Sequence, residues 1–329
     1  MKLRHIAMTA AFSVATGIGA AQADPVNMTL SGGNPGGLWS LLGAGMDRAV
    51  KEANPNSVIT YQATGGGFAN IGLLSQGRTD LGLVHDAEIG IALAGDEPFG
   101  EPIENMLAVG YMYNWAPMHF FLRKSIAEEY GITSLDDIAE SGAPITIGIN
   151  RSGNITANVA LRMLEEAGAT EEVIEANGGS FVRAGANDQA DLIRDGRIDM
   201  VTNGVFILHS SFRAVDENNE VVVLDIPDHV IEATNAAFGT QRYTIPGGSY
   251  SNQPDDIETA ALGALLVTHD AADEEAIYSL TSALIEHIDE VRAVHGSMSA
   301  LDTELFASQT SLPFHPGAEQ ALREAGLLQ

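Results

Sequence analysis

LLSQGRTDL at residues 73–81 and LIRDGRIDM at residues 192–200 share one pattern: two apolar residues, two others, Gly-Arg, any residue, Asp and an apolar residue. In each stretch the glycine stands where a helix ends in the left-handed conformation, and a short apolar run follows. The pattern therefore predicts a helix, a glycine C-cap and a buried strand. The two copies lie too far apart for a solenoid, whose repeats are about 20 to 50 residues long. We expect two similar α/β lobes with a cleft between them, and chance recurrence of a common connector is the alternative.

The rest of the chain alternates short apolar runs with helical stretches, which is typical of α/β proteins. Glycine-rich turns join the strands to the helices in the first 95 residues, so these turns should open at one edge of a parallel sheet. Further along, we expect strands at 106–112 and 118–123 on either side of residues 113–117, a strand at 260–268 that crosses back, and one long helix over 273–294. We expect a first lobe at 24–116, an inserted second lobe at 117–227, and a second part of the first lobe, with a hinge crossing, at 228–329.

The first 23 residues have the features of a secretory signal peptide. A basic start with Lys2 and Arg4 precedes an apolar run that is too short for a membrane span, and Ala21-Gln22-Ala23 gives the small-x-small cleavage pattern. No cysteine occurs anywhere in the chain, so neither lipid attachment nor metal binding through cysteine is available. We expect cleavage after Ala23, export to the periplasm and no direct membrane insertion.

The chain is strongly acidic, with a formal net charge of -28 at pH 7. Such a surface is a poor match for nucleic acid, because that interaction depends on basic patches. Two explanations of this negative charge compete. It is either an adaptation to a salty medium, in which surface charges are screened, or it creates an electric field that attracts cations. The acids are spread along the chain and many fall in first turns of predicted helices, so we favour the solvent explanation.

Three turns at predicted strand ends are the places where a ligand should bind. They are SGGNPGGLW at 31–39, TGGG at 64–67 and NRSGN at 150–154. Ligands of open α/β sheets bind outside the carboxyl ends of the strands. Glycine lets a backbone come close to a ligand, as at Gly65, and helix N-termini offer unpaired N–H groups to an anion. The turns therefore favour a carboxylate or another small anion.

Several side chains in these turns are candidate ligand contacts. Arg151 offers a guanidinium for bidentate binding of a carboxylate, and an exposed arginine paired with an acid is the alternative. Trp39 stands at a helix start where its ring covers either a ligand or the core. Polar side chains at other strand or helix ends contact the ligand or cap their own backbone; they are Asn34, Thr64, Asn70, Ser152, Asn154 and Asn203.

No motif argues for an enzyme. The nine histidines form no H-E-x-x-H or similar spacing, so we expect no metal site, and we find no nucleophile elbow, Walker loop or complete dinucleotide fingerprint that predicts a cofactor. The sequence therefore favours a binding protein over a catalyst.

Taken together, the signal peptide and four motifs resemble the TAXI family, the extracytoplasmic solute receptors of TRAP transporters. The motifs are GGNPGGLW at 32–39, TGGGFANI at 64–71, GRTDLGLV at 77–84 and IPGGSY at 245–250, and LPFHPGA at 312–318 continues the match. The resemblance implies a type II periplasmic-binding-protein fold, α/β, whose two lobes close on a ligand. It also implies delivery to TRAP membrane permease subunits, and ligands such as glutamate or 2-oxoglutarate.

The chain departs from this family at two places where ligand should lie. His85-Asp86-Ala87 replaces a common Gln-Ser-Asp, and NRSGN at 150–154 replaces Pro-Gly-Ser-Gly-Thr. Arg151 favours a dicarboxylate, whereas His85 and Asp86 favour an amino group or a hydroxyl. Two alternatives stay open: a periplasmic enzyme that uses His85 and Asp86 as acid and base, and a receptor that presents its ligand to a chemosensory partner.

Overall fold

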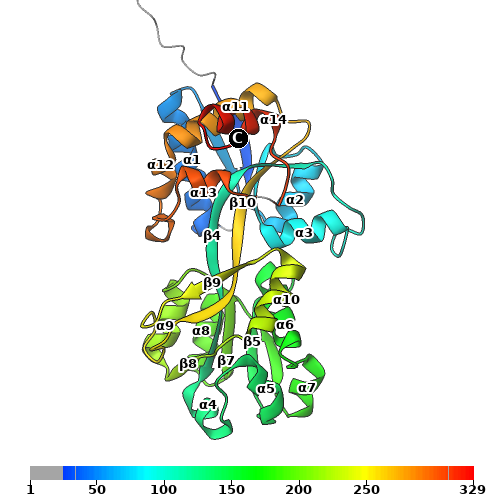
Figure 1. Cartoon of the computed structure of the whole chain (residues 1–329), viewed down its shortest axis with the longest axis vertical. Helices are drawn as coiled ribbons and strands as arrows, with labels where there is room; N and C mark the ends of the chain where they lie inside the picture. The colour runs from blue at the N-terminus through cyan, green and yellow to red at the C-terminus, as the bar shows by residue number, and fades with distance from the viewer. Residues whose placement is uncertain (1–24, 34, 310) are drawn as a thin grey trace, which may run out of the picture.

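A computed structural model describes residues 25–33, 35–309 and 311–329 and shows two lobes, one above the other (Figure 1). The expected signal peptide and Asn34 lie outside these residues. Within the described ranges, no helix is long and apolar enough to cross a membrane. The strands form one mixed sheet in the order β2-β1-β3-β10-β4-β7-β5-β6, with β8 on β4 and β9 on β10.

The upper lobe begins with three parallel strands, each followed by a helix. The strands β1, β2 and β3 pair in the order β2-β1-β3. They are parallel, as the sequence predicted, so that their carboxyl ends meet at one edge. Their bounds, with those of the helices that follow, are β1 Asn27–Ser31, α1 Leu38–Ala53, β2 Val58–Gln62, α2 Gly67–Ser75, β3 Leu81–His85 and α3 Asp86–Ala94.

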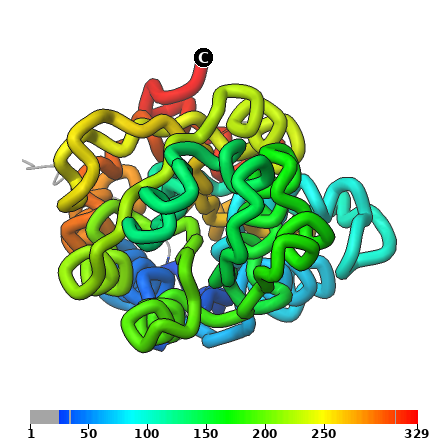
Figure 2. The backbone as a smooth tube through the Cα atoms, turned by 90° about the horizontal axis from the view of Figure 1, so that it is seen from below, coloured from blue at the N-terminus to red at the C-terminus, as the bar shows by residue number. Residues whose placement is uncertain are grey.

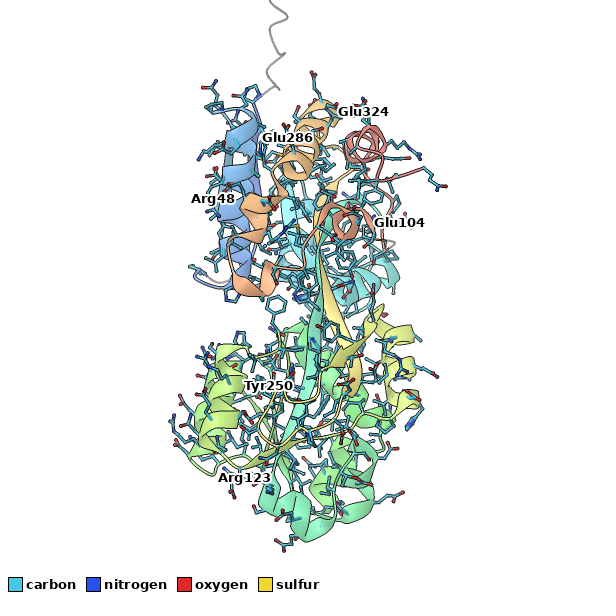
Figure 3. All side chains as sticks on the ribbon, turned by 60° about the vertical axis from the view of Figure 1, so that its left-hand side comes forward. Arg48, Glu104, Arg123, Tyr250, Glu286 and Glu324 are labelled. Atoms are coloured by element: carbon cyan, nitrogen blue, oxygen red, sulfur yellow. The ribbon has the colours of Figure 1, made fainter. Side chains whose placement is uncertain are left out.

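Two long antiparallel strands, β4 (Met106–Arg123) and β10 (Ile257–His269), run through both lobes (Figure 1). Figure 3 shows this extent of β4, since Glu104 just before it is labelled in the upper lobe and Arg123 at its end in the lower lobe. The expected break at 113–117 was wrong. Pairing with β10 continues through that segment, and irregularities in the register absorb its bends without ending the strand.

The lower lobe repeats the strand and helix alternation around β7, β5 and β6, and Figure 2 shows this lobe from below. β5 is parallel to both β6 and β7, while β4 pairs antiparallel with β7 and β8. The bounds are α4 Lys124–Tyr130, α5 Leu135–Ser141, β5 Thr146–Ile149, α6 Ile155–Glu166, α7 Glu171–Ala176, β6 Ser180–Arg183, α8 Ala186–Arg194, β7 Met200–Gly204, α9 Ser210–Asn218, β8 Val221–Val223, α10 Asp228–Phe238 and β9 Gln241–Ile245.

The chain returns to the upper lobe after β10 and ends there in helices (Figure 1). The single helix expected at 273–294 was wrong, because His287 leaves the helical conformation at φ -118° and ψ 35° and separates two helices. The second of these helices packs against α1. The bounds are α11 Glu274–Glu286, α12 Ile288–Arg292, a 3-10 turn at Gly296–Met298, α13 Thr303–Ala307 and α14 Pro316–Glu324.

Both copies of the repeated motif have the structure predicted for them. Gly77 and Gly196 take left-handed φ values of 63° and 71° directly after a helix, and a buried strand follows each. The aspartate of each copy accepts a hydrogen bond from a backbone N–H of the neighbouring strand. Asp80 Oδ2 accepts from the N–H of Thr29 at 2.7 Å, and Asp199 Oδ2 accepts from the N–H of Thr146 at 2.9 Å. Each copy therefore ties a strand to its parallel neighbour and belongs to the scaffold.

Candidate functional site

A cavity of about 310 Å³ lies between the lobes and takes its walls from both. It is lined by Gly33, Gly37, Leu38, Trp39, Gly65, Gly66, Gly67, His85, Glu88, Tyr113 and Ala116 from the upper part, and by Gly153, Asn154, Ile155, Gly204, Val205, Phe206 and His209 from the lower part. A larger cavity of about 420 Å³, between α4 and β8, contains none of the turns that follow the predicted ligand-facing strands. The cavity of about 310 Å³ contains residues of all three predicted turns and is therefore the candidate site.

The helices that follow the three predicted turns all begin at the wall of this cavity. α1 follows Gly37 and α2 follows Gly66, and neither glycine caps its helix with a side chain. α6 follows Asn154, whose side chain accepts a hydrogen bond from the N–H of Thr156. The first N–H groups of a helix lack partners within it and carry partial positive charge. The arrangement therefore suits an anionic group such as a carboxylate.

Aromatic rings form another part of the wall. Trp39 is 9% exposed, and its Nε1–H donates to the Tyr113 hydroxyl at 3.0 Å. Tyr113 packs edge-on against Phe206 with ring centroids 5.1 Å apart, which joins a strand of the crossing to a loop of the lower lobe. Burial raises the pKa of Tyr113, so its hydroxyl keeps its proton at neutral pH. These rings give the cavity an apolar, uncharged side.

A histidine, His85, and a carboxylate, Glu88, lie together at the start of α3. The half-buried His85 is the last residue of β3, and its Nδ1 lies 3.2 Å from Glu88 Oε2. The same oxygen accepts a hydrogen bond from the backbone N–H of His85 at 2.9 Å, and the two residues form a capping box. The Glu88 side chain is only 3% exposed, yet it lines the cavity.

Asp86 lies behind the cavity wall and is almost fully buried. Its Oδ2 accepts hydrogen bonds from the Tyr111 hydroxyl at 2.7 Å and from the N–H of Gly263 at 2.9 Å. Burial raises the pKa of Asp86 to about 6, and the hydrogen bonds limit the rise. Asp86 thus joins α3 to both strands that cross between the lobes, β4 and β10.

A second buried network holds the loop that carries Phe206 and His209. His119 Nδ1 donates to the Pro117 carbonyl, so its Nε2 accepts the Tyr250 hydroxyl proton at 2.9 Å. Tyr250, labelled in the lower lobe of Figure 3, accepts in turn from the N–H of Leu208 at 3.1 Å. Burial lowers the pKa of His119 to about 4, so the ring is neutral at pH 7.

The structure brings four of the predicted contact residues to the cavity wall. They are Trp39, Gly65, His85 and Asn154. Three others support the wall from behind, since Thr64 Oγ1 bonds Asn70 Oδ1 at 2.6 Å, Asn70 Nδ2 donates to the Leu83 carbonyl, and Asn203 Oδ1 accepts from Asn150.

Arg151 and Ser152 are exposed and do not line the cavity in this conformation. The Arg151 side chain is 70% exposed, and its Nη2 lies 2.6 Å from Asp188 Oδ2. This is the alternative that the sequence left open for Arg151, an exposed arginine paired with an acid.

Sequence reasoning missed Glu88, Tyr113, Phe206 and His209, which all line the cavity. Glu88 follows His85 by three residues at a helix start, which is the spacing of a capping box and a usable signal. The other three carry no signal in the sequence, because their position depends on the bends of β4 and on the loop after β7.

Two α/β lobes joined by crossing strands, with a cavity between them, define a type II periplasmic-binding-protein fold. The chain belongs to the NMT1-like family, whose model matches residues 30–326. It is similar in fold to MatC of Rhodopseudomonas palustris, solved with bound malate, at a TM-score of 0.54 and 14% identity over 92% of this chain and 98% of that one. It is also similar to a TctC solute-binding protein from Polaromonas, at a TM-score of 0.53 and 13% identity over 82% and 86%.

Proposed function

We propose that this chain is a periplasmic receptor of the TAXI type that captures a small organic acid or amino acid and delivers it to a TRAP membrane permease. The observation that carries the proposal is the cavity between the lobes, at which the helices after the three predicted turns begin. Helix N-termini bind anions without needing a basic side chain. The solved relative with bound malate and the sequence resemblance favour a small carboxylate such as glutamate or 2-oxoglutarate.

The proposal includes how the chain is divided and which residues touch ligand. We assign the first lobe to 24–116 and the second to 117–227. Residues 228–329 form the crossing, whose α10 and β9 lie in the lower lobe, and the second part of the first lobe. Trp39, Gly65, His85 and Asn154 contact the ligand, because they line the cavity. Closure of the lobes then couples binding to a shape that the permease recognises.

Thermal unfolding with a panel of organic acids and amino acids tests the proposal. A ligand that binds the folded state at 100 times its Kd stabilises it by about 2.7 kcal/mol, which raises Tm by at least about 3 °C. A panel that leaves Tm unchanged at saturating concentrations contradicts the proposal. Genes for both permease subunits beside this one support the transporter partner, whereas a neighbouring chemoreceptor gene points to the sensory alternative.

A further inference from the structure

The Glu88 carboxylate lies at the cavity wall and is only partly hydrogen-bonded within the described residues. Its Oε2 is engaged by His85, but no hydrogen-bond partner for its Oε1 is found in the part of the chain that the structure describes. The side chain is 3% exposed and lines the cavity. A buried carboxylate is costly unless it is paired and its oxygens are satisfied.

Neither lysine nor arginine supplies that partner. None of the described residues that line the cavity is Lys or Arg, and His85 is charged only when protonated. Glu88 lies against Gly67 at the start of α2, whose dipole offsets part of the negative charge. The remaining charge faces a cavity that a ligand is expected to fill.

The aromatic rings that line the same cavity as Glu88 also favour the binding of a cation. Trp39, Tyr113 and Phe206 line the same cavity, and Trp39 and His85 lie with ring centroids 4.8 Å apart. Aromatic faces attract a desolvated cation through their quadrupoles, and Trp does so most strongly. A carboxylate and aromatic rings that line one cavity together suit an ammonium group.

We infer that Glu88 and the rings of Trp39, Tyr113 and Phe206 bind the ammonium group of the ligand, so that the ligand is an α-amino acid. The inference rests on the proposed function and narrows its ligand class. Glu88 occupies the start of α2, which leaves the starts of α1 and α6 for the ligand carboxylate. We place it at α6, beside Gly153 and Asn154, because this start lies in the lobe opposite Glu88. A bound amino acid then connects the two lobes.

Calorimetric titration of the full mature chain with the standard L-amino acids and their matching 2-oxo acids tests the inference. The two members of each pair differ at the ammonium group. At least one amino acid should bind more than tenfold more tightly than its 2-oxo acid. Oxo acids that bind as tightly as, or more tightly than, their amino acids overturn this inference and leave the proposed function standing. No binding by either series also overturns this inference, whereas the proposed function is overturned only when the wider panel of organic acids fails as well.

Glu88→Gln removes the charge and keeps the shape. We expect it to weaken amino-acid binding more than tenfold and to change 2-oxo-acid binding less than threefold. Glu175→Gln, on the exposed surface of α7, is the matched control and should change neither. Equal losses for both ligand classes overturn the inference. If Glu88→Gln does not fold, the comparison of amino acids with their 2-oxo acids in the wild-type chain is the test of the inference.

Discussion

Glu88 packs so closely against Gly67 that a Cβ at this glycine would overlap the carboxylate. The glycine is the first residue of α2, and Glu88 is in the first turn of α3. Two helices that follow β2 and β3, the strands on either side of β1, thus meet at one side chain of the cavity wall. The contact explains why this position of the glycine-rich turn cannot carry a side chain.

Gly67→Ala should therefore displace Glu88 and weaken ligand binding by tenfold or more. Gly72→Ala is the matched control, because Gly72 lies in the same helix and a Cβ there meets nothing within 4 Å. The control should keep its affinity and gain about 0.5 to 1 kcal/mol of stability, since alanine favours a helix over glycine. Calorimetry and urea unfolding of both variants measure this, and equal affinities would contradict the role of the contact.

Tyr113→Phe removes the acceptor of the Trp39 indole N–H, which is buried. A buried donor left without a partner costs about 1 to 3 kcal/mol. We expect a loss of stability in that range by urea unfolding. Tyr130→Phe, at an exposed position of α4, should change stability by less than about 0.5 kcal/mol. Similar values for the two variants would show that the Trp39 bond contributes nothing.

Asp86 should make stability fall as pH rises from about 4 to 6. Its pKa is raised from 3.8 to about 6 in the folded state, so the folded chain binds the proton more tightly than the unfolded chain does. The stability that this provides is fully present below pH 3.8 and is lost as pH rises through about 6, by about 3 kcal/mol. The difference in unfolding free energy between wild type and Asp86→Asn, measured from pH 4 to 7, should show this slope. A difference that is constant with pH would contradict it.

Arg151→Ala should change ligand affinity less than threefold, because the guanidinium is 70% exposed and pairs with Asp188 outside the cavity. Asn154→Ala, which alters a residue of the cavity wall in the same turn, should weaken binding more. Titration of both variants with one ligand measures the contrast. A loss above tenfold for Arg151→Ala would show that this turn moves into the cleft when the lobes close.

The sequence predicted the scaffold well wherever local chemistry determines it. α1 is one of the helices that the predicted alternation of strands and helices requires, and its amphipathic run ends before Asn54-Pro55. The two Gly-Arg-x-Asp stretches form the expected C-caps, since glycine alone takes the left-handed conformation freely. β4 was divided by mistake because Asn114 and Pro117 indicate a turn locally, whereas pairing with β10 keeps the strand extended.

The candidate site was predictable only in part. Strand ends and glycine turns pointed to Trp39, Gly65, His85 and Asn154, which line the cavity. Glu88 is one turn further into a helix, where a glutamate indicates an exposed face unless its burial is known. Its burial depends on the neighbouring helix start at Gly67, which no local pattern reveals.

The most direct test of the central claim is mass spectrometry of the ligand released from mature protein purified out of its native host. We expect one intact small carboxylate for each chain, and an ammonium group on that molecule if Glu88 has the role inferred above. A released molecule without a carboxylate, or a compound that the protein has chemically changed, would contradict the account.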